Sequence, residues 1–263
     1  MSSPAERPYD PGEYADRSLP RRALISYQAL GWHVFVRRAL ASVPRELARP
    51  VLRLYRARPR SFVWNGELLP QFHHGYNSTW ENERAVEIPI VKREVDQTPA
   101  GERVLEIGCV LPHYFDVTHR VVDKYEPGRG VENVDILDFR DPDRFDLVVS
   151  ISTLEHVGRD EEGGDDQLAV RAIEHVASKL LRPGGRFVAT VPIGYNGALD
   201  RWLRDHPPEF AVTYLRRVDR RNNWAVCEPT EALASRYGWP YRAANAVAVL
   251  GFVAARAAPP EER

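Results

Sequence analysis

The sequence contains very few cysteines, and the two that are present, Cys109 and Cys227, stand alone. The absence of a Cys-x-x-Cys pair and of Cys/His pairs at metal-ligand spacing argues against a disulfide framework and a structural zinc site. No apolar run approaches the ~18 residues that a membrane span requires, and residues 1–20 lack the apolar core of a signal peptide. We therefore expect no metal, no integral membrane segment and a cytoplasmic location.

The chain also has almost no net charge. Its 36 Lys and Arg residues balance 37 Asp and Glu residues, for a formal charge of −1 at pH 7, so no overall field would draw it to nucleic acid. The segment 21–60 differs because arginines alternate there with apolar residues at helical spacing. It is interpreted either as helices packed on the main domain or as a basic amphipathic surface for a membrane or an acidic partner.

Short apolar runs bounded by turn residues dominate the chain from residue 102 onward. Runs that are this short and β-branched, without polar alternation, are typical of parallel strands buried on both faces. A helix over 168–180, closed by Pro183-Gly184-Gly185, separates two of them, as in a βαβ crossover. The pattern predicts an α/β fold with a doubly wound, mostly parallel seven-stranded sheet, helices on both faces and an N-terminal helical extension. Six of the strands are expected at 103–107, 120–123, 131–135, 145–151, 186–191 and 246–255.

The composition divides the chain into four regions. The ends are rich in charged residues and proline, and the segment before the first strand is dense in aromatic and polar side chains. We expect a flexible tail, a helical extension that ends in this dense segment, an α/β domain and a second tail, at 1–20, 21–85, 86–257 and 258–263 respectively.

Polar residues follow the predicted strands at their carboxyl ends, which is where ligands bind in open α/β sheets. Gly108 comes directly after the first strand and permits a tight turn. Asp123 ends the second strand, and a carboxylate there can accept the hydroxyl protons of a ribose. Asp135 and Ile136 end the third strand, where a carboxylate and an aliphatic side chain can meet an adenine ring. The fourth strand ends at Ser150-Ile151 beside the same crevice.

At this point the sequence resembles class I S-adenosyl-L-methionine-dependent methyltransferases of the Rossmann-like type. The matching pieces are VLEIGCV, VVDKYEP, VDILDF, FDLVVSISTLEHV and LLRPGGRFVATVPIGYN, which cover about residues 102–195 in the family's order. The resemblance implies S-adenosyl-L-methionine as cofactor, with Gly108 under the methionine part, Asp123 on the ribose and Asp135 beside the adenine. It also implies that Glu106 organises the glycine loop. Further cofactor-binding positions are Val110, Lys124, Ile136, Ser150 and Ile151.

Two departures from the family pattern affect the loop. Gly108 is followed by Cys109-Val110-Leu111-Pro112, where further small residues are usual, and Asp123 follows after only 15 residues, against ~20 in dinucleotide folds. The first crossover helix must therefore be clipped to a turn or two. Either the loop has adapted to its cofactor, or the chain is a non-catalytic binding protein with a degenerate glycine loop.

Two residues past the fourth strand are candidates for chemistry. His156 in STLEHV has the side chain best suited to take a proton near neutrality, although its ring could equally serve only to order the loop. Glu155 is its rival as catalytic residue. Arg84 could pair with the methionine carboxylate of the cofactor by a bidentate contact.

Tyr76 and Trp80 belong to a dense segment that would cover the ligand, with solvated helix residues as the alternative interpretation. Tyr195 and Asn196 follow the fifth strand at the same rim, where they could contact substrate. The resemblance implies methyl transfer, and the aromatic and arginine residues between Trp202 and Tyr241 lead us to expect an oxygen of a small molecule such as a sugar or a secondary metabolite as acceptor. A nicotinamide-dependent oxidoreductase is disfavoured because no Gly-x-Gly-x-x-Gly occurs.

Overall fold

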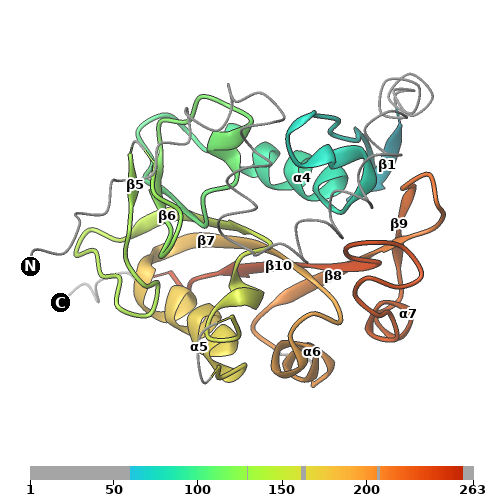
Figure 1. Cartoon of the computed structure of the whole chain (residues 1–263). Coiled ribbons are helices and arrows are strands. Elements are labelled where there is room, and N and C mark those ends of the chain that lie inside the picture. The colour runs from blue at the N-terminus through green and yellow to red at the C-terminus, as the bar shows by residue number, and fades with distance from the viewer. Residues whose placement is uncertain (1–59, 129, 161–163, 206–207, 257–263) are drawn as a thin grey trace, which may run out of the picture. The chain divides into compact units, whose positions relative to one another are not determined.

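An eight-stranded sheet forms the centre of the computed structural model (Figure 1). The structure describes residues 60–128, 130–160, 164–205 and 208–256. Both expected tails and residues 21–59 of the Arg-rich segment lie outside these residues. Apart from Pro127 and Gly128, the described residues belong to one unit that comprises Pro59–Glu126 and Gly130–Arg263.

The strands of the sheet lie in the order β5-β4-β3-β6-β7-β10-β8-β9. Neighbours from β5 to β7 pair in parallel, whereas β10 is antiparallel to β7 and β8, and β9 is antiparallel to β8. The chain therefore winds outward from β3 in one direction and, from β6, in the other, which confirms the doubly wound, mostly parallel fold. The strands are β3 (Val104–Ile107), β4 (Arg120–Val122), β5 (Val131–Glu132), β6 (Phe145–Ile151), β7 (Leu181–Pro192), β8 (Ala211–Arg217), β9 (Trp224–Cys227) and β10 (Ala246–Val253).

The described sheet has one strand more than the seven expected. All six strands predicted by residue range are present, but β8 and β9 had not been located. β8 ends in Leu-Arg-Arg, and β9 is an edge strand that exposes two of its four side chains. Both lie in the antiparallel part of the sheet.

The predicted helix is confirmed as α5 (Gln167–His175) followed by a π-helical turn, η4 (Val176–Leu180). The expectation that Pro183-Gly184-Gly185 closes this helix is wrong, because the helix ends at Leu180 and the three residues lie inside β7. Glycine is required there for another reason. A Cβ on Gly185 would lie 2.8 Å from the carbonyl oxygen of Phe145, on the strand that pairs with β7.

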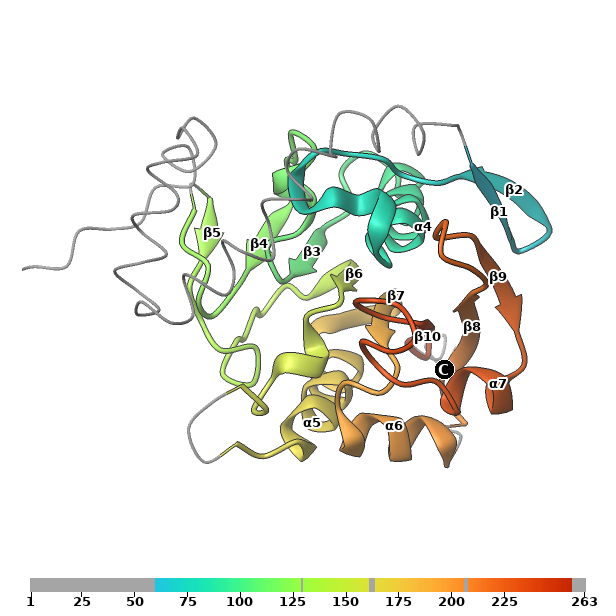
Figure 2. The ribbon, with the colours of Figure 1, turned by 45° about the vertical axis from the view of Figure 1, so that its right-hand side comes forward.

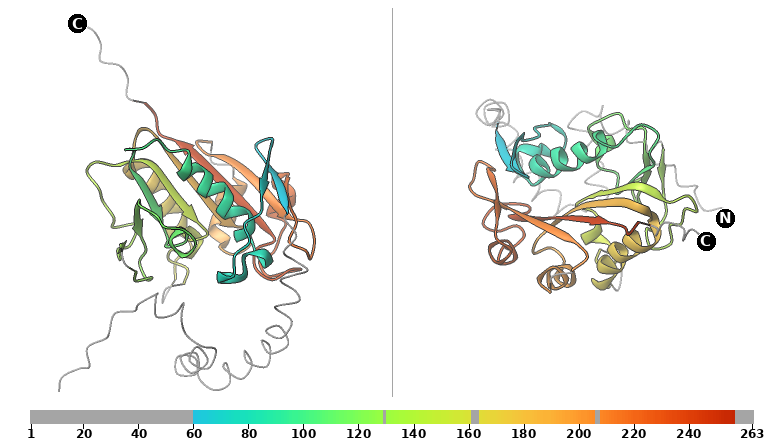
Figure 3. Two further views of the ribbon diagram at one scale, coloured as in Figure 1. Left: turned by 90° about the horizontal axis from the view of Figure 1, so that it is seen from above. Right: turned by 180° about the vertical axis from the view of Figure 1, so that it is seen from behind.

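Helices cover both faces of the sheet, as expected (Figures 1 and 2). On one face lie α5, α6 (Gly197–Arg204) and α7 (Pro229–Leu233), whose buried side chains form one apolar cluster with the strands. On the other face α4 (Arg84–Asp96) packs Val86 and Ile90 near Val247, and Ile88 and Val91 near the centre of β6. Figure 3 shows α4 and α5 on opposite sides of the sheet.

The part of the predicted helical extension that the structure describes is not wholly helical. Residues 61–70 form a hairpin of β1 (Ser61–Trp64) and β2 (Glu67–Pro70), and η1 (Tyr76–Glu81) precedes α4. Asn65 and Gly66, with φ of 49° and 79°, make the turn. Asn-Gly between apolar residues is the strongest short hairpin signal, and the sequence interpretation missed it.

The prediction that the first crossover helix is shortened to a turn or two is confirmed. Between β3 and β4 the only helical element is η2, a single 3-10 turn over Leu111–His113. Among the residues that the structure describes, no helix is both long and apolar enough to cross a membrane.

Candidate cofactor site

Gly108 makes the turn that the sequence predicts at the end of β3. Its φ is +87°, a left-handed conformation that favours glycine, and a Cβ there would lie 2.0 Å from Oγ1 of Thr153. Its amide donates to the carbonyl oxygen of Val122 at 2.8 Å. The turn therefore lies where the ends of β3, β4 and β6 meet.

Glu106 organises the loop, as the resemblance implies. Its side chain is fully buried, and Oε1 accepts hydrogen bonds from the amides of Val110 at 2.9 Å and Leu111 at 2.7 Å. Oε2 lies 2.8 Å from Nε2 of His119. A buried carboxylate requires such partners to offset the loss of its hydration, and these contacts hold the half-buried Val110 in place.

Asp123 follows β4 and holds two loops together. Oδ2 accepts a hydrogen bond from the amide of Cys109 at 3.1 Å, and Oδ1 accepts from the amides of Tyr125 at 2.8 Å and Glu126 at 2.7 Å. Each carboxylate oxygen has two acceptor positions. The described residues thus fill both positions on Oδ1 and one on Oδ2, and among them none fills the last acceptor position.

Asp135 follows β5 and is paired within the protein. Oδ1 accepts from the amide of Leu137 at 2.9 Å, and Oδ2 lies 2.9 Å from Nζ of Lys124. Desolvation opposes ionisation, but the Leu137 amide and Lys124 outweigh it and lower the pKa of Asp135. Ile136 beside it is buried. The ends of β4 and β5 are thereby joined by an ion pair.

The predicted residues of β6 are buried in the sheet. Ser150 has no exposed surface, and its hydroxyl donates to the carbonyl oxygen of Ile107 at 3.0 Å. The side chain of Ile151 is also buried, while its carbonyl oxygen accepts from Arg84 at 3.2 Å and from the Thr153 hydroxyl at 3.1 Å. Ser150 serves to link β3 and β6.

Arg84 lies in a buried cluster of charged side chains that the sequence interpretation missed. It donates to Oε2 of Glu87 at 2.7 Å, and the other oxygen of Glu87 accepts the Ser152 hydroxyl at 2.5 Å. Glu83 and Glu155 complete the cluster, and burial is the first cause that raises the pKa of each of these two carboxyls. The available signal was Glu83 and Glu87, one helical turn apart beside an apolar run.

Glu155 is buried, with 1% exposure, and Oε2 has no hydrogen-bond partner among the described residues. Its pKa is raised well above the usual value by burial first, and by the charges of Glu87 and Glu83. Since Arg84 opposes the shift only partly, Glu155 favours its protonated form relative to an exposed carboxyl.

His156 is exposed and is oriented by a carboxylate. Its Nδ1 lies 2.5 Å from Oδ2 of Asp160, while Nε2 lies 3.5 Å from Oε1 of Glu155. Tyr195 donates its hydroxyl to the same Asp160 at 3.1 Å, and its ring centroid lies 4.6 Å from that of His156. Burial raises the pKa of Tyr195 to about 12, so this hydroxyl keeps its proton near neutrality. The structure thus brings His156 and Tyr195 together.

Asn196 has a structural role in place of the expected substrate contact. It is buried and forms the N-cap of α6, with Oδ1 accepting from the amides of Ala198 and Leu199 at 3.0 Å. Nδ2 donates to the carbonyl oxygens of Glu155 at 3.0 Å and Asp166 at 3.4 Å. All four hydrogen-bonding positions of the amide are used within the protein, so none is left for a substrate.

Tyr76 and Trp80 lie in η1 (Tyr76–Glu81). The Tyr76 ring is 48% exposed and stacks on His113, with centroids 4.5 Å apart, and Trp80 is half-buried. The expected lid residue Tyr76 thus contacts the segment that follows Gly108, while covering of a ligand stays a prediction.

Comparisons with known proteins add a likeness of fold. No family profile and no curated protein sequence matches the chain. Among solved structures it is similar to the N-methyltransferase NodS from Bradyrhizobium japonicum in complex with S-adenosyl-L-homocysteine, at 15% identity and a TM-score of 0.33 over 58% of this chain and 78% of that one. A TehB-like SAM-dependent methyltransferase from Corynebacterium glutamicum gives 14% and 0.35, over 62% and 86%.

A third similar structure is the 16S rRNA methylase RmtB, at 15% identity and a TM-score of 0.35 over 67% of this chain and 65% of that one. NodS is an N-methyltransferase, whereas RmtB methylates 16S rRNA. Likeness at this level of identity and TM-score assigns no substrate to this chain.

Proposed function

We propose that this chain binds S-adenosyl-L-methionine along the carboxyl ends of β3, β4 and β5. The observation that carries the proposal is the set of polar residues at three adjacent strand ends, Glu106, Asp123 and Asp135, next to the glycine turn at Gly108. The point where strand order reverses, between β3 and β6, is where doubly wound sheets bind their ligands. The acceptor position of Asp123 that no described residue fills fits a ribose hydroxyl.

The bound cofactor would supply a methyl group on a positively charged sulfur. We propose transfer to a hydroxyl oxygen of a small molecule such as a sugar or a secondary metabolite, with His156 as the base. A carboxylate on Nδ1 fixes the ring and leaves Nε2 to accept the hydroxyl proton, and Nε2 lies 3.5 Å from Glu155, longer than a strong hydrogen bond. As the carbon–oxygen bond forms, the carbon–sulfur bond breaks, and its electrons stay on sulfur.

Glu155 is assigned a positioning role in this proposal. With 1% of its surface exposed, it cannot meet a substrate proton directly, but it lies beside His156 on η3 (Leu154–His156). A small-molecule substrate is favoured over nucleic acid because the net charge of −1 supplies no phosphate-attracting field. A cytoplasmic location and a peripheral or protein contact through residues 21–60, most of which lie outside the described residues, remain proposals from the sequence.

A non-catalytic binding protein is the second candidate, and one observation favours it. The acceptor positions that a cofactor would use are largely taken within the protein, three on Asp123 by backbone amides and one oxygen of Asp135 by Lys124. In this alternative the carboxylates maintain the loops and bind no adenosine.

Calorimetric titration of the purified chain with S-adenosyl-L-methionine and S-adenosyl-L-homocysteine, with NADH as the control ligand, separates these candidates. We expect micromolar binding of the first two ligands alone. Asp123→Asn removes a charge that a ribose hydroxyl would share, which costs roughly 1.5–3 kcal/mol, or about 10- to 100-fold in affinity. The matched control is Asp143→Asn. Asp143 precedes β6 and so lies at the amino ends of the parallel strands, away from the carboxyl ends, and its side chain is 75% exposed.

Absence of binding to both sulfur ligands by the folded wild-type chain would overturn the proposal. Equal affinities of wild type and Asp123→Asn would remove Asp123 from the site. His156→Gln should leave the affinity for S-adenosyl-L-homocysteine unchanged and lower the turnover of an accepted substrate by about 10²- to 10⁴-fold, the usual contribution of a general base. A loss of binding in that variant would instead indicate that His156 orders the loop.

A further inference from the structure

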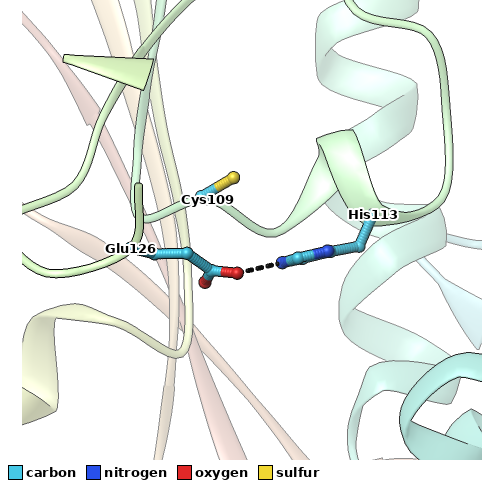
Figure 4. Close-up of side chains that lie close together, drawn as sticks. All are labelled: Cys109, His113 and Glu126. Carbon is cyan, nitrogen blue, oxygen red and sulfur yellow. Dashed lines mark ion pairs between the residues drawn. The ribbon is translucent and has the colours of Figure 1, made fainter. Parts of the chain in front are cut away.

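Three side chains with metal-binding atoms converge beside the glycine turn (Figure 4). Cys109 follows Gly108, His113 lies on η2, and Glu126 lies in the loop after β4. The sulfur, an imidazole nitrogen and a carboxylate oxygen all lie within 4.8 Å of one another. Nε2 of His113 is 2.8 Å from Oε1 of Glu126. The spacing of 109, 113 and 126 matches no common metal motif, which explains why the sequence predicted no metal.

The backbone that carries these three residues is fixed by buried or half-buried carboxylates. Asp123 holds the amides of both Cys109 and Glu126, one on each oxygen. Glu106 holds the amides of residues 110 and 111, and the amide of His113 donates to the carbonyl oxygen of residue 110 at 3.3 Å. The ring of Tyr76 stacks on His113 from the other side. Outer contacts of this kind orient the ligands of metal sites.

The chemistry of the three donors favours Zn²⁺. A thiolate excludes Mg²⁺ and Ca²⁺ as preferred ions, and sulfur, nitrogen and oxygen donors together suit zinc. Zinc bonds of roughly 2.0–2.3 Å place neighbouring tetrahedral ligand atoms roughly 3.3–3.7 Å apart. The widest separation allowed here, 4.8 Å, therefore requires a closure of about 1 Å. Cys109 is 7% exposed while His113 and Glu126 are half-buried, so an ion can enter from their side.

We propose that Cys109, His113 and Glu126 bind one Zn²⁺ ion through three protein ligands, with the fourth position open to water. Three metal–ligand bonds form, the thiol releases its proton to solvent, and no electron is transferred. The ion would take the place of the direct His113–Glu126 contact and link the clipped β3–β4 connection to the loop after β4. A ligand that binds the folded state raises its thermal stability by mass action.

Titration of the chelator-treated full-length chain with Co²⁺, a spectroscopic substitute for Zn²⁺, tests this site without any methyl donor. We expect one equivalent to bind, with a thiolate-to-cobalt charge-transfer band that Zn²⁺ removes by displacement. Cys109→Ser should abolish the band. His113→Gln and Glu126→Gln should each weaken Co²⁺ binding by at least about tenfold, and both should lose the rise in midpoint temperature that Zn²⁺ causes in wild type.

The matched control is Cys227→Ser, because Cys227 is the only other cysteine and lies on β9, away from this cluster. It should retain the band and the wild-type affinity. Circular dichroism of each variant separates loss of metal from loss of fold, and the two glutamine variants change residues that are only half-buried. A wild-type chain without the band, or a band that survives Cys109→Ser, would overturn the proposal whether or not S-adenosyl-L-methionine binds.

Discussion

The loop after β3 should depend on one buried carboxylate. Glu106 is fully buried and accepts hydrogen bonds from two backbone amides, while its second oxygen meets His119. Glu106→Ala would leave the buried amide of Leu111, the amide of Val110 and the ring of His119 without this partner. Each buried group left unpaired costs about 1–3 kcal/mol. Because the loop can relax partly toward water, we expect the free energy of unfolding to fall by roughly 3–6 kcal/mol.

Urea denaturation followed by circular dichroism measures this loss as a shift of the midpoint at constant slope. Glu106→Gln should lose far less than Glu106→Ala, because an amide oxygen can still accept from the loop. Glu102→Ala is the matched control, since Glu102 is exposed four residues earlier on the same segment, and its midpoint should not move. A Glu106→Ala loss below about 1 kcal/mol, the size of one ordinary hydrogen bond, would refute the idea that this carboxylate holds the loop.

Three further perturbations follow from the same region. Gly108→Ala should lower the midpoint by the equivalent of about 1–3 kcal/mol, because φ is +87° and the new Cβ meets Thr153; an unchanged midpoint would contradict the turn geometry. Asn196→Ala removes the N-cap of α6 and should cost about 1–2 kcal/mol, read from the same urea curves. Folding raises the pKa of Glu155. The stability that Glu155 contributes to the folded state is therefore present below its unfolded pKa and is lost as pH rises through its folded pKa. Glu155→Gln should therefore gain stability relative to wild type as pH rises above the ordinary value of 4.5, and a pH-independent difference would refute the assignment.

The part of the fold that the sequence predicted is the part that is buried on both faces. The runs that became β3, β4 and β6 are short and mostly apolar, and each contains Val or Ile, so their length and β-branched residues identify them. β8 and β9 were not located: β8 ends in two arginines, and β9 is a run of only four residues at the antiparallel edge of the sheet. The hairpin of β1 and β2 was identifiable from Asn65-Gly66, but the surrounding arginine pattern favoured a helix.

The sequence likewise predicts only part of the candidate site. A glycine after a buried strand and carboxylates after the next two follow from the chain alone, because the carboxyl ends of parallel strands share one edge. Which residues a polar side chain pairs with does not follow from the sequence alone. Arg84 was expected to meet a ligand, yet Glu87, one turn along the same helix, and the carbonyl oxygen of Ile151 are its partners. The sequence contains both residues, but only the packing of α4 on β6 places them next to residue 151.

Because the β3–β4 connection is short, the carboxylates at the strand ends have a structural role that does not depend on a ligand. In a longer βαβ connection the first amides of a helix remain open to bind an anion. Here η2 is a single turn, and the amides of residues 109, 110 and 111 are satisfied by Asp123 and Glu106 instead. The carboxylates therefore stabilise the loop whether or not a cofactor binds, and their presence alone does not separate an enzyme from a binding fold. No described residue fills the remaining acceptor position on Oδ2 of Asp123, so the result that separates them is binding of S-adenosyl-L-methionine that Asp123→Asn weakens.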